Sequence, residues 1–327
     1  MRKVNIEDYK RFQIPEDLLD QLFRTNAFKL FVPRAFGGLQ LDLKSASQRI
    51  TETSAHFGGL GWVLNLGAGA NWFSGFFEAE AAKTIFSPKG TVIAGSGADS
   101  GNFKTEDGSV LLNGNWGKCS GAAHANYFSL NAKNADTGEL SSFVVPRESV
   151  EFSEDKWGIF GLKSTSSLSI NLSDVRVPQE FGFHINSIKN HFDYKVFHIP
   201  FEQFARVCMS SCFSGIAQCF LNTLHAEQIF KADFELITDS LRQKISSAIQ
   251  NRDAIAESIE HESREGILSD RLQAAVRIRL GQANMLIFDE IQQMFKTAGL
   301  ALVEEDKLSH WAYRDVLTAI HHPMMKV

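Results

Sequence analysis

Residues 112–127 read LNGNWGKCSGAAHANY, and the rest of the chain is organised around this stretch. A β-compatible run precedes it and another, residues 127–132, follows it, while Asn-Gly is a common tight-turn dipeptide. The segment 120–123 has almost no side-chain bulk, so a flat ligand could approach its backbone closely. The stretch predicts either the wall of a binding site or a glycine-containing loop between two sheet strands.

The composition is that of an ordinary globular protein. The chain has 327 residues, of which 44% are hydrophobic and 22% charged, enough for roughly two or three structural units around a well-buried core. Phenylalanine occurs 27 times, which suits a large core or an aromatic-lined pocket. The formal charge is −5, and no run of lysine and arginine occurs. Nucleic acid is therefore not an expected partner.

The cysteines and the start of the chain predict the compartment. Cys208, Cys212 and Cys219 lie in one apolar helical segment and Cys119 lies in the central stretch, a spacing that fits neither a disulfide framework nor a zinc site. No apolar segment follows Met1-Arg2-Lys3, and no run of about 18 uninterrupted apolar residues occurs. We expect reduced structural thiols, no metal, no membrane and a cytoplasmic protein.

The hydrophobic period divides the chain into three parts. Residues 1–90 predict an N-terminal helical domain, with a helix starting at Pro15. Residues 91–180 change to period two, as in 168–172, and predict a central β domain of short strands. Residues 181–327 return to the helical period and predict a C-terminal helical bundle. The last long helix carries an apolar stripe from Val276 to Ala298 and ends at Gly299.

Two helical segments are unusually rich in small residues. The segment 62–77 contains Gly67, Gly69 and Gly75, and each glycine costs a helix about 1 kcal/mol relative to alanine. The segment 204–231 carries small side chains between residues 210 and 217. Close packing against another backbone, or a nearby ligand, would offset that cost.

Four motifs in this order resemble the acyl-CoA dehydrogenase superfamily of flavoproteins, over almost the whole chain. They are Val32-Pro33 to Gly37-Gly38, Asn113-Gly114 to Ser120-Gly121, Trp157 to Pro178 with Gly161-Leu162-Lys163-Ser164-Thr165 inside it, and Arg314-Asp315. The resemblance implies an α+β fold with an N-terminal helical domain, a small central β-barrel or sandwich, and a C-terminal four-helix bundle.

The details resemble one branch, the reduced-flavin-dependent two-component monooxygenases. Their pattern Gly-x-Trp-x-x-x-Ser-Gly matches residues 114–121 at every fixed position. Dehydrogenases of the superfamily usually carry a catalytic glutamate shortly after the Arg-Asp pair, but no acidic residue follows Asp315 here. The monooxygenase branch places a histidine in that region, where this chain has His321 and His322.

The resemblance also implies the site residues. Ser120 and His322 are the expected catalytic residues, with His321 as the competing histidine. The expected flavin-binding residues are Ser96, Trp116, Cys119, Ser120, Trp157, Thr165 and Ser167. Both tryptophans have an alternative interpretation as core residues. The family's Arg-Gly-Thr-Gly-Ser is Lys163-Ser164-Thr165-Ser166-Ser167 here, so two glycines are replaced by serine.

The sequence thus predicts a flavin-dependent oxidoreductase with FAD or FMN. It is expected to be a monooxygenase that uses reduced flavin and oxygen on a small aromatic or heteroatom substrate. A separate flavin reductase and a homo-oligomer, dimer or tetramer, are the implied partners. The alternatives are an acyl-CoA dehydrogenase with a relocated base and a non-catalytic flavin-binding scaffold.

Overall fold

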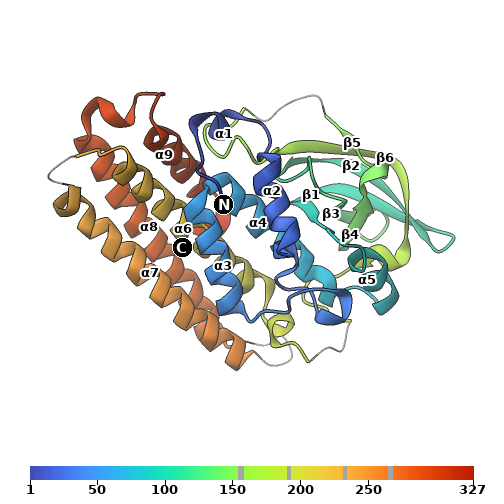
Figure 1. Cartoon of the computed structure of the whole chain (residues 1–327). Helices are drawn as coiled ribbons and strands as arrows, with labels where there is room; N and C mark the ends of the chain where they lie inside the picture. The colour runs from blue at the N-terminus through green and yellow to red at the C-terminus, as the bar shows by residue number, and fades with distance from the viewer. Residues whose placement is uncertain (154–157, 190–192, 231–233, 264–267) are drawn as a thin grey trace.

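Helices from both ends of the chain lie together, and the sheet formed by its middle lies beside them (Figure 1). The computed structural model describes residues 1–153, 158–189, 193–230, 234–263 and 268–327. The helices are α1 (Ile6–Lys10), α2 (Glu16–Arg24), α3 (Leu43–His56), α4 (Gly58–Asn71), α5 (Ala79–Phe86), α6 (Phe201–Ala226), α7 (Phe234–Glu262), α8 (Asp270–Thr297) and α9 (Leu308–Ala319). The strands are β1 (Ile93–Glu106), β2 (Ser109–Cys119), β3 (Tyr127–Asn134), β4 (Leu140–Pro146), β5 (Glu151–Phe152), β6 (Leu168–Pro178) and β7 (Gly182–Phe183). The α+β prediction is confirmed.

Two N-terminal helices begin at side-chain caps. At α1, Asn5 and Asp8 form a capping box, in which each side chain accepts the backbone N–H of the other residue. At α3, Asp42 accepts the Ser45 N–H at 2.7 Å. These caps fix the starts of α1 and α3.

Helix α4 uses its glycines mainly for close packing. A Cβ added at Gly61 would lie 2.0 Å from Ser54 Oγ on α3, and one at Gly67 would lie 2.8 Å from the Phe28 ring. A Cβ at Gly69 would meet nothing within 4 Å. Packing therefore accounts for Gly61 and Gly67, whereas Gly69 opens onto free space.

The central strands form one seven-stranded sheet in the order β5-β6-β2-β1-β3-β4-β7. The tight turn between β1 and β2 is Asp107-Gly108, where both residues have positive φ, as a type I′ turn requires. Asn113-Gly114, the expected turn, instead lies inside β2, where Gly114 pairs with Gly101. The Trp116 ring covers this pair, and a Cβ at Gly101 would lie 2.0 Å from it. The glycines therefore make room for a ring and not for a turn.

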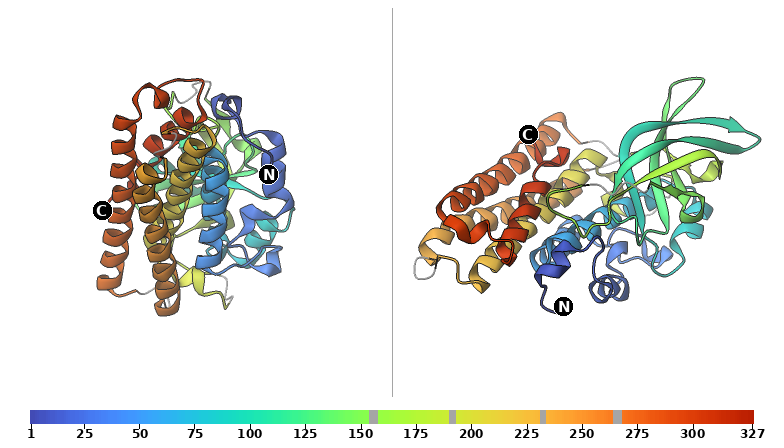
Figure 2. Two further views of the ribbon diagram at one scale, coloured as in Figure 1. Left: turned by 60° about the vertical axis from the view of Figure 1, so that its left-hand side comes forward. Right: turned by 90° about the horizontal axis from the view of Figure 1, so that it is seen from above.

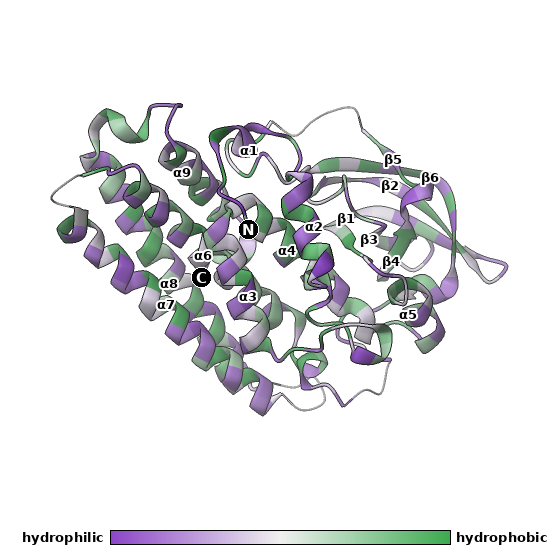
Figure 3. Cartoon of the chain, viewed as in Figure 1, coloured by the Kyte–Doolittle hydropathy of each residue, from purple (hydrophilic) through white to green (hydrophobic). Residues whose placement is uncertain are grey.

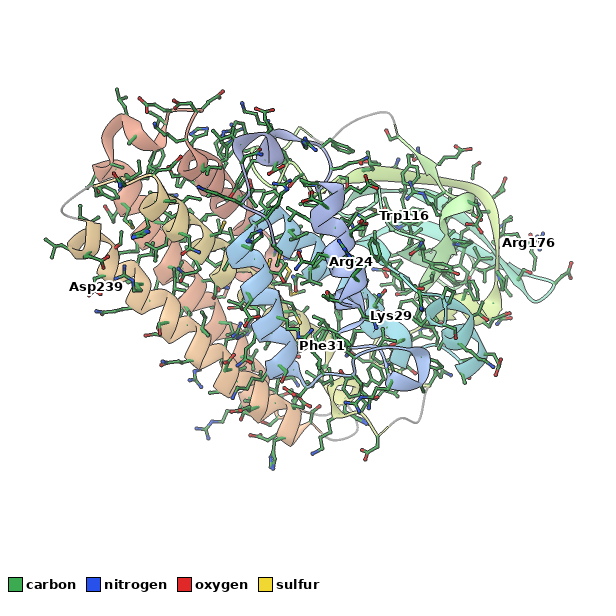
Figure 4. All side chains as sticks on the ribbon, viewed as in Figure 1. Arg24, Lys29, Phe31, Trp116, Arg176 and Asp239 are labelled. Carbon is green, nitrogen blue, oxygen red and sulfur yellow. The ribbon has the colours of Figure 1, made fainter. Side chains whose placement is uncertain are left out.

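The sheet curls around an apolar cluster of its own, as the two further views show (Figure 2). Side chains of β1, β2, β3, β4 and β6 fill this cluster, with Trp116 and Phe128 fully buried in it. Figure 4 labels Trp116 within the sheet and Arg176 at its outer edge. The β domain is thus a barrel-like layer with its own core.

The C-terminal helices pack around α6. This helix is long and apolar enough to cross a membrane by length and composition alone, but 89% of its most apolar 18-residue window is buried inside the protein. Burial of this kind is typical of the core helix of a water-soluble protein. Helices α7 and α8 mix hydrophilic and hydrophobic residues along their length (Figure 3). The predicted stripe of α8 is confirmed, because Val276, Leu280, Ile287, Ile291 and Met294 are buried.

The small residues of α6 bring α3 close. A Cβ at Gly215 would lie 2.4 Å from the Thr51 carbonyl oxygen of α3, and Thr51 Oγ1 donates to the Ser211 carbonyl at 3.0 Å. Close helix packing, one of the two interpretations of this segment, is therefore observed. Helices from before and after the sheet thus share one core.

All four cysteines are buried and free.

Candidate functional site

Three hydroxyl groups meet where β2 ends and the loop before β6 passes it. Ser120 Oγ lies 2.7 Å from Ser167 Oγ, which lies 3.0 Å from Thr165 Oγ1. Thr165 Oγ1 also donates to the Leu162 carbonyl oxygen at 2.8 Å. We call Ser120, Thr165 and Ser167 the hydroxyl cluster. The structure thus brings three of the predicted flavin-binding residues into contact.

Backbone hydrogen bonds hold the cluster together. The Gly121 N–H donates to the Thr165 carbonyl at 2.7 Å, which joins the two loops directly. The segment between α1 and α2 lies against them, since the Ser166 N–H donates to the Phe12 carbonyl at 2.9 Å and Gln13 forms a β-bridge with Thr165. Three remote parts of the chain are therefore needed to form this site.

Helix α9 fixes the loop that carries Thr165. Arg314 Nε donates to the Phe160 carbonyl at 2.8 Å, and the Gly161 N–H donates to Thr318 Oγ1 at 2.8 Å. The Leu162 N–H donates to a carboxylate oxygen of Asp315 at 2.6 Å. We call these three hydrogen bonds the α9 clamp.

Asp315 is buried, and burial raises the pKa of its carboxyl to about 7, although the Leu162 N–H and the nearby Arg314 guanidinium act in the opposite direction. A Cβ at Gly58, the first residue of α4, would lie 2.8 Å from its second oxygen. The sequence marks Asp315 only as half of the Arg-Asp pair and does not reveal its place in the clamp, because the partner loop lies far away in the chain.

His322 lies in the short turn that follows α9. Its Nδ1 accepts the Met324 N–H at 3.3 Å, and its ring contacts Trp62 of α4 edge to face, with centroids 5.8 Å apart. Burial lowers the pKa of His322 to about 4, so the imidazole is neutral at pH 7. Because Nδ1 accepts a hydrogen bond, we assign the ring hydrogen to Nε2. His321 is exposed.

Two predicted flavin-binding residues lie in the core of the sheet. Trp116 is fully buried, and its Nε1 donates to the Asn131 carbonyl at 2.9 Å. Cys119 is also fully buried, and burial raises the pKa of its thiol to about 12. Trp116 therefore packs in the core of the sheet, which is the alternative interpretation that the sequence allowed. Neither Trp116 nor Cys119 belongs to the hydroxyl cluster.

Of the two remaining predicted flavin-binding residues, Ser96 and Trp157, the structure describes only Ser96. Ser96 is half-buried at a register shift of β1, and its Oγ accepts the Ala98 N–H at 3.4 Å. A Cβ at the neighbouring Gly97 would meet nothing within 4 Å. Trp157 lies outside the described residues. Neither Ser96 nor His322 makes a hydrogen bond to the hydroxyl cluster that would join the predicted residues into one network.

A cleft of about 530 Å³ opens beside the loop that follows Ser120. It is lined by Arg11, Phe12, Gln13, Ile14, Pro15, Glu16, Leu19, Ala123 and His124. Burial, and to a lesser extent the Arg147 charge, lowers the pKa of His124 to about 4, and its Nε2 has no hydrogen-bond partner. No spacing signal in the sequence marked His124. Within the described ranges, no three His, Cys, Asp or Glu side chains could hold a metal ion.

The chain is similar in sequence to flavin-dependent oxygenase components. No protein-family model matches the chain. It is 30% identical over 193 residues to the flavin-dependent monooxygenase oxygenase subunit HsaA of Rhodococcus jostii, which is 58% of this chain and 50% of that protein. It is 28% identical over 171 residues to the FADH2-dependent resorcinol hydroxylase oxygenase component of a Rhizobium species, which is 51% of this chain and 42% of that protein. The chain thus spans about half the length of the curated relatives it matches.

Solved structures share the fold over nearly the whole chain. XiaF from a Streptomyces species, in complex with FADH2 and glycerol, superposes with a TM-score of 0.86 at 21% identity, covering 98% of this chain and 87% of that one. Butyryl-CoA dehydrogenase from Megasphaera elsdenii superposes with a TM-score of 0.79 at 13% identity, covering 96% and 88%. These comparisons confirm the resemblance to the superfamily and to its monooxygenase branch.

Proposed function

We propose that this chain is the oxygenase component of a flavin-dependent monooxygenase, because it has the acyl-CoA dehydrogenase-like fold and its relatives are such oxygenase components. It takes reduced FAD or FMN and dioxygen, and places one oxygen atom on a small aromatic or heteroatom substrate. The second oxygen atom leaves as water. The FADH2-dependent resorcinol hydroxylase and the complex of XiaF with FADH2 support the reduced state of the cofactor.

The hydroxyl cluster is the observation that carries this proposal. A flavin edge needs small polar groups beside it. Ser120 lies at the end of the cluster and is its most exposed member, with 8% of its surface exposed, against 1% for Thr165 and 4% for Ser167. Ser120, as the most exposed member of the cluster, would contact the flavin edge. The bound flavin supplies the electrons that activate dioxygen, and the protein supplies position and polarity.

His322 is proposed to orient the substrate. As a neutral imidazole with its hydrogen on Nε2, it is a hydrogen-bond donor to a phenolic or other oxygen. The Trp62 ring beside it offers an apolar surface for an aromatic substrate. A general-base role for His322 is less compatible with this geometry, because Nδ1 already accepts the Met324 N–H.

The dehydrogenase alternative is less supported. Removal of an α-proton from an acyl thioester needs a carboxylate near the flavin, and the last acidic residue of the chain is Asp315. Its carboxylate is occupied by the Leu162 N–H. Thioester oxidation would therefore need a base from another helix.

Partners and organisation complete the proposal. A separate flavin reductase supplies the reduced cofactor, the protein works in the cytoplasm, and the chain divides at about residues 90 and 180 into the three units expected from its sequence. Exposed apolar side chains on α8, namely Ile278, Met285 and Leu286, support assembly into a homo-oligomer.

Stopped-flow absorbance tests the proposal. The protein is mixed anaerobically with reduced FMN or FAD and then with oxygen, and recovery of the oxidised-flavin absorbance is followed for wild type, S120A and the control S169A. We expect wild type and S169A to delay recovery relative to free flavin, and S120A to shorten the delay. Recovery as fast as in buffer for wild type would refute the oxygenase proposal. Bleaching of bound oxidised flavin by an acyl-CoA would favour the dehydrogenase instead.

A further inference from the structure

The hydroxyl cluster has a fixed hydrogen-bond direction. A serine or threonine hydroxyl has one hydrogen and can donate only once, whereas a carbonyl oxygen can only accept. Thr165 Oγ1 lies 2.8 Å from the Leu162 carbonyl oxygen, so Thr165 donates its single hydrogen there. In its 3.0 Å contact with Ser167, Thr165 must therefore be the acceptor.

The same argument extends to Ser120. Ser167 donates its hydrogen to Thr165, so in the 2.7 Å contact between Ser167 and Ser120 the donor is Ser120. Any other order would place two oxygen lone pairs face to face within 3.0 Å inside the protein, at a cost comparable to a lost hydrogen bond. The hydrogens run in one direction, from Ser120 to Ser167 to Thr165 to the Leu162 carbonyl.

The Leu162 carbonyl, the acceptor at the end of this series of hydrogen bonds, is firmly held. The Leu162 N–H is bound by Asp315, and the Leu162 carbonyl also accepts the Thr165 N–H at 3.2 Å. Thr165 and Ser167 are 1% and 4% exposed, so water does not compete for their hydroxyls. The carbonyl that sets the order therefore cannot turn away without losing the Thr165 N–H hydrogen bond.

Ser120 consequently offers only lone pairs to anything that binds beside it. We infer that Thr165 and Ser167 are positioning residues that make Ser120 a hydrogen-bond acceptor, so that the site favours reduced flavin over oxidised flavin. Reduced flavin carries a hydrogen on N5 and can donate to Ser120, whereas the N5 of oxidised flavin is itself an acceptor and would face another lone pair. This inference rests on the proposed function, because it takes Ser120 to contact the flavin edge.

Anaerobic binding titrations test the inference without turnover. Dissociation constants for oxidised and for dithionite-reduced FMN and FAD are measured for wild type, T165V, T165S, S167A and S120A, and their ratio is compared. Wild type should bind the reduced form more tightly. T165V and S167A release the Ser120 hydrogen, so they should tighten binding of oxidised flavin and reduce the ratio by about 3- to 10-fold, the effect of one hydrogen bond.

The controls distinguish a change in the hydrogen-bond direction of the hydroxyl cluster from a general loss of structure. T165S keeps the hydroxyl and should keep the wild-type ratio, while S120A should weaken binding of reduced flavin, because it removes the acceptor itself. Thermal melting checks that each variant is folded. An unchanged ratio in folded T165V and S167A would overturn this inference but leave the proposed function standing. Failure of wild type to bind either redox state would overturn the proposed function itself.

Discussion

Gly59 of α4 and Ser164 of the loop before β6 fit together so closely that a Cβ at Gly59 would lie 2.2 Å from Ser164 Oγ. Ser164 replaces a glycine of the family's motif and is buried. The contact joins the helical layer to the loop that carries Thr165 and Ser167.

The first prediction concerns this contact. G59A should destabilise the protein by about 1–3 kcal/mol, because the added methyl overpacks a buried site, even though alanine favours a helix. Adding S164A removes the oxygen that the methyl strikes, so the double variant should recover most of the loss. Chemical denaturation of both single variants and the double variant gives the coupling energy. Additive losses would show that the two residues do not interact.

The second prediction separates the two serines that replace family glycines. Ser166 has φ +44 in the left-handed region, and its buried hydroxyl has no hydrogen-bond partner. S166G should therefore raise the free energy of unfolding by about 1 kcal/mol. Ser164 has no such backbone conformation and fills the space at Gly59, so S164G should lower it. A loss of stability in S166G would contradict this interpretation of its backbone strain.

The third prediction concerns pH. The pKa of Asp315, raised to about 7 by burial, lies above the value of about 3.9 in an unfolded chain. The folded state then binds more protons between those pH values, so the Asp315 contribution is complete below about pH 4 and is lost as pH rises through 7. D315N keeps an acceptor for the Leu162 N–H but does not titrate.

The measurement is the free energy of unfolding of wild type and D315N from pH 4 to 8. The difference between them should change by up to the order of 4 kcal/mol across this range, with D315N becoming relatively more stable as pH rises. Taking the difference removes the opposing contributions of His124 and His322, which both proteins share. Parallel curves would show that Asp315 is ionised in the folded state throughout.

The fourth prediction concerns the protonation of His322. Because burial lowers its pKa to about 4, the ring should stay neutral, with its hydrogen on Nε2, as pH falls through 6 and 5. Nitrogen NMR of labelled protein measures both the tautomer and the titration, and the spectrum of H322Q assigns the signal. A titration near pH 6.5 would mean that the ring is solvated and does not act as a neutral donor.

Periodicity and motif spacing predicted a large part of this architecture, and local backbone irregularities limited the rest. The α8 stripe was visible because its period continues through many turns. The orientation of Trp116 and Cys119 was not, because the pairing of β2 with β6 shifts register between them at Lys118, whose φ is +64. This bulge turns Cys119 back to the face of Trp116, so simple alternation fails. The α9 clamp could not be predicted, because nothing in the sequence of α9 or of residues 160–162 indicates that the two segments are in contact.

The α9 clamp also bears on the order of folding. Leu162 and Asp315 are 153 positions apart, so their hydrogen bond closes a loop that spans almost half of the chain. Contacts of such long separation form late, and during synthesis α9 leaves the ribosome after the sheet and the loop before β6. A growing chain thus contains the strands and the hydroxyl cluster residues before it contains α9, whose clamp holds the loop that carries Thr165.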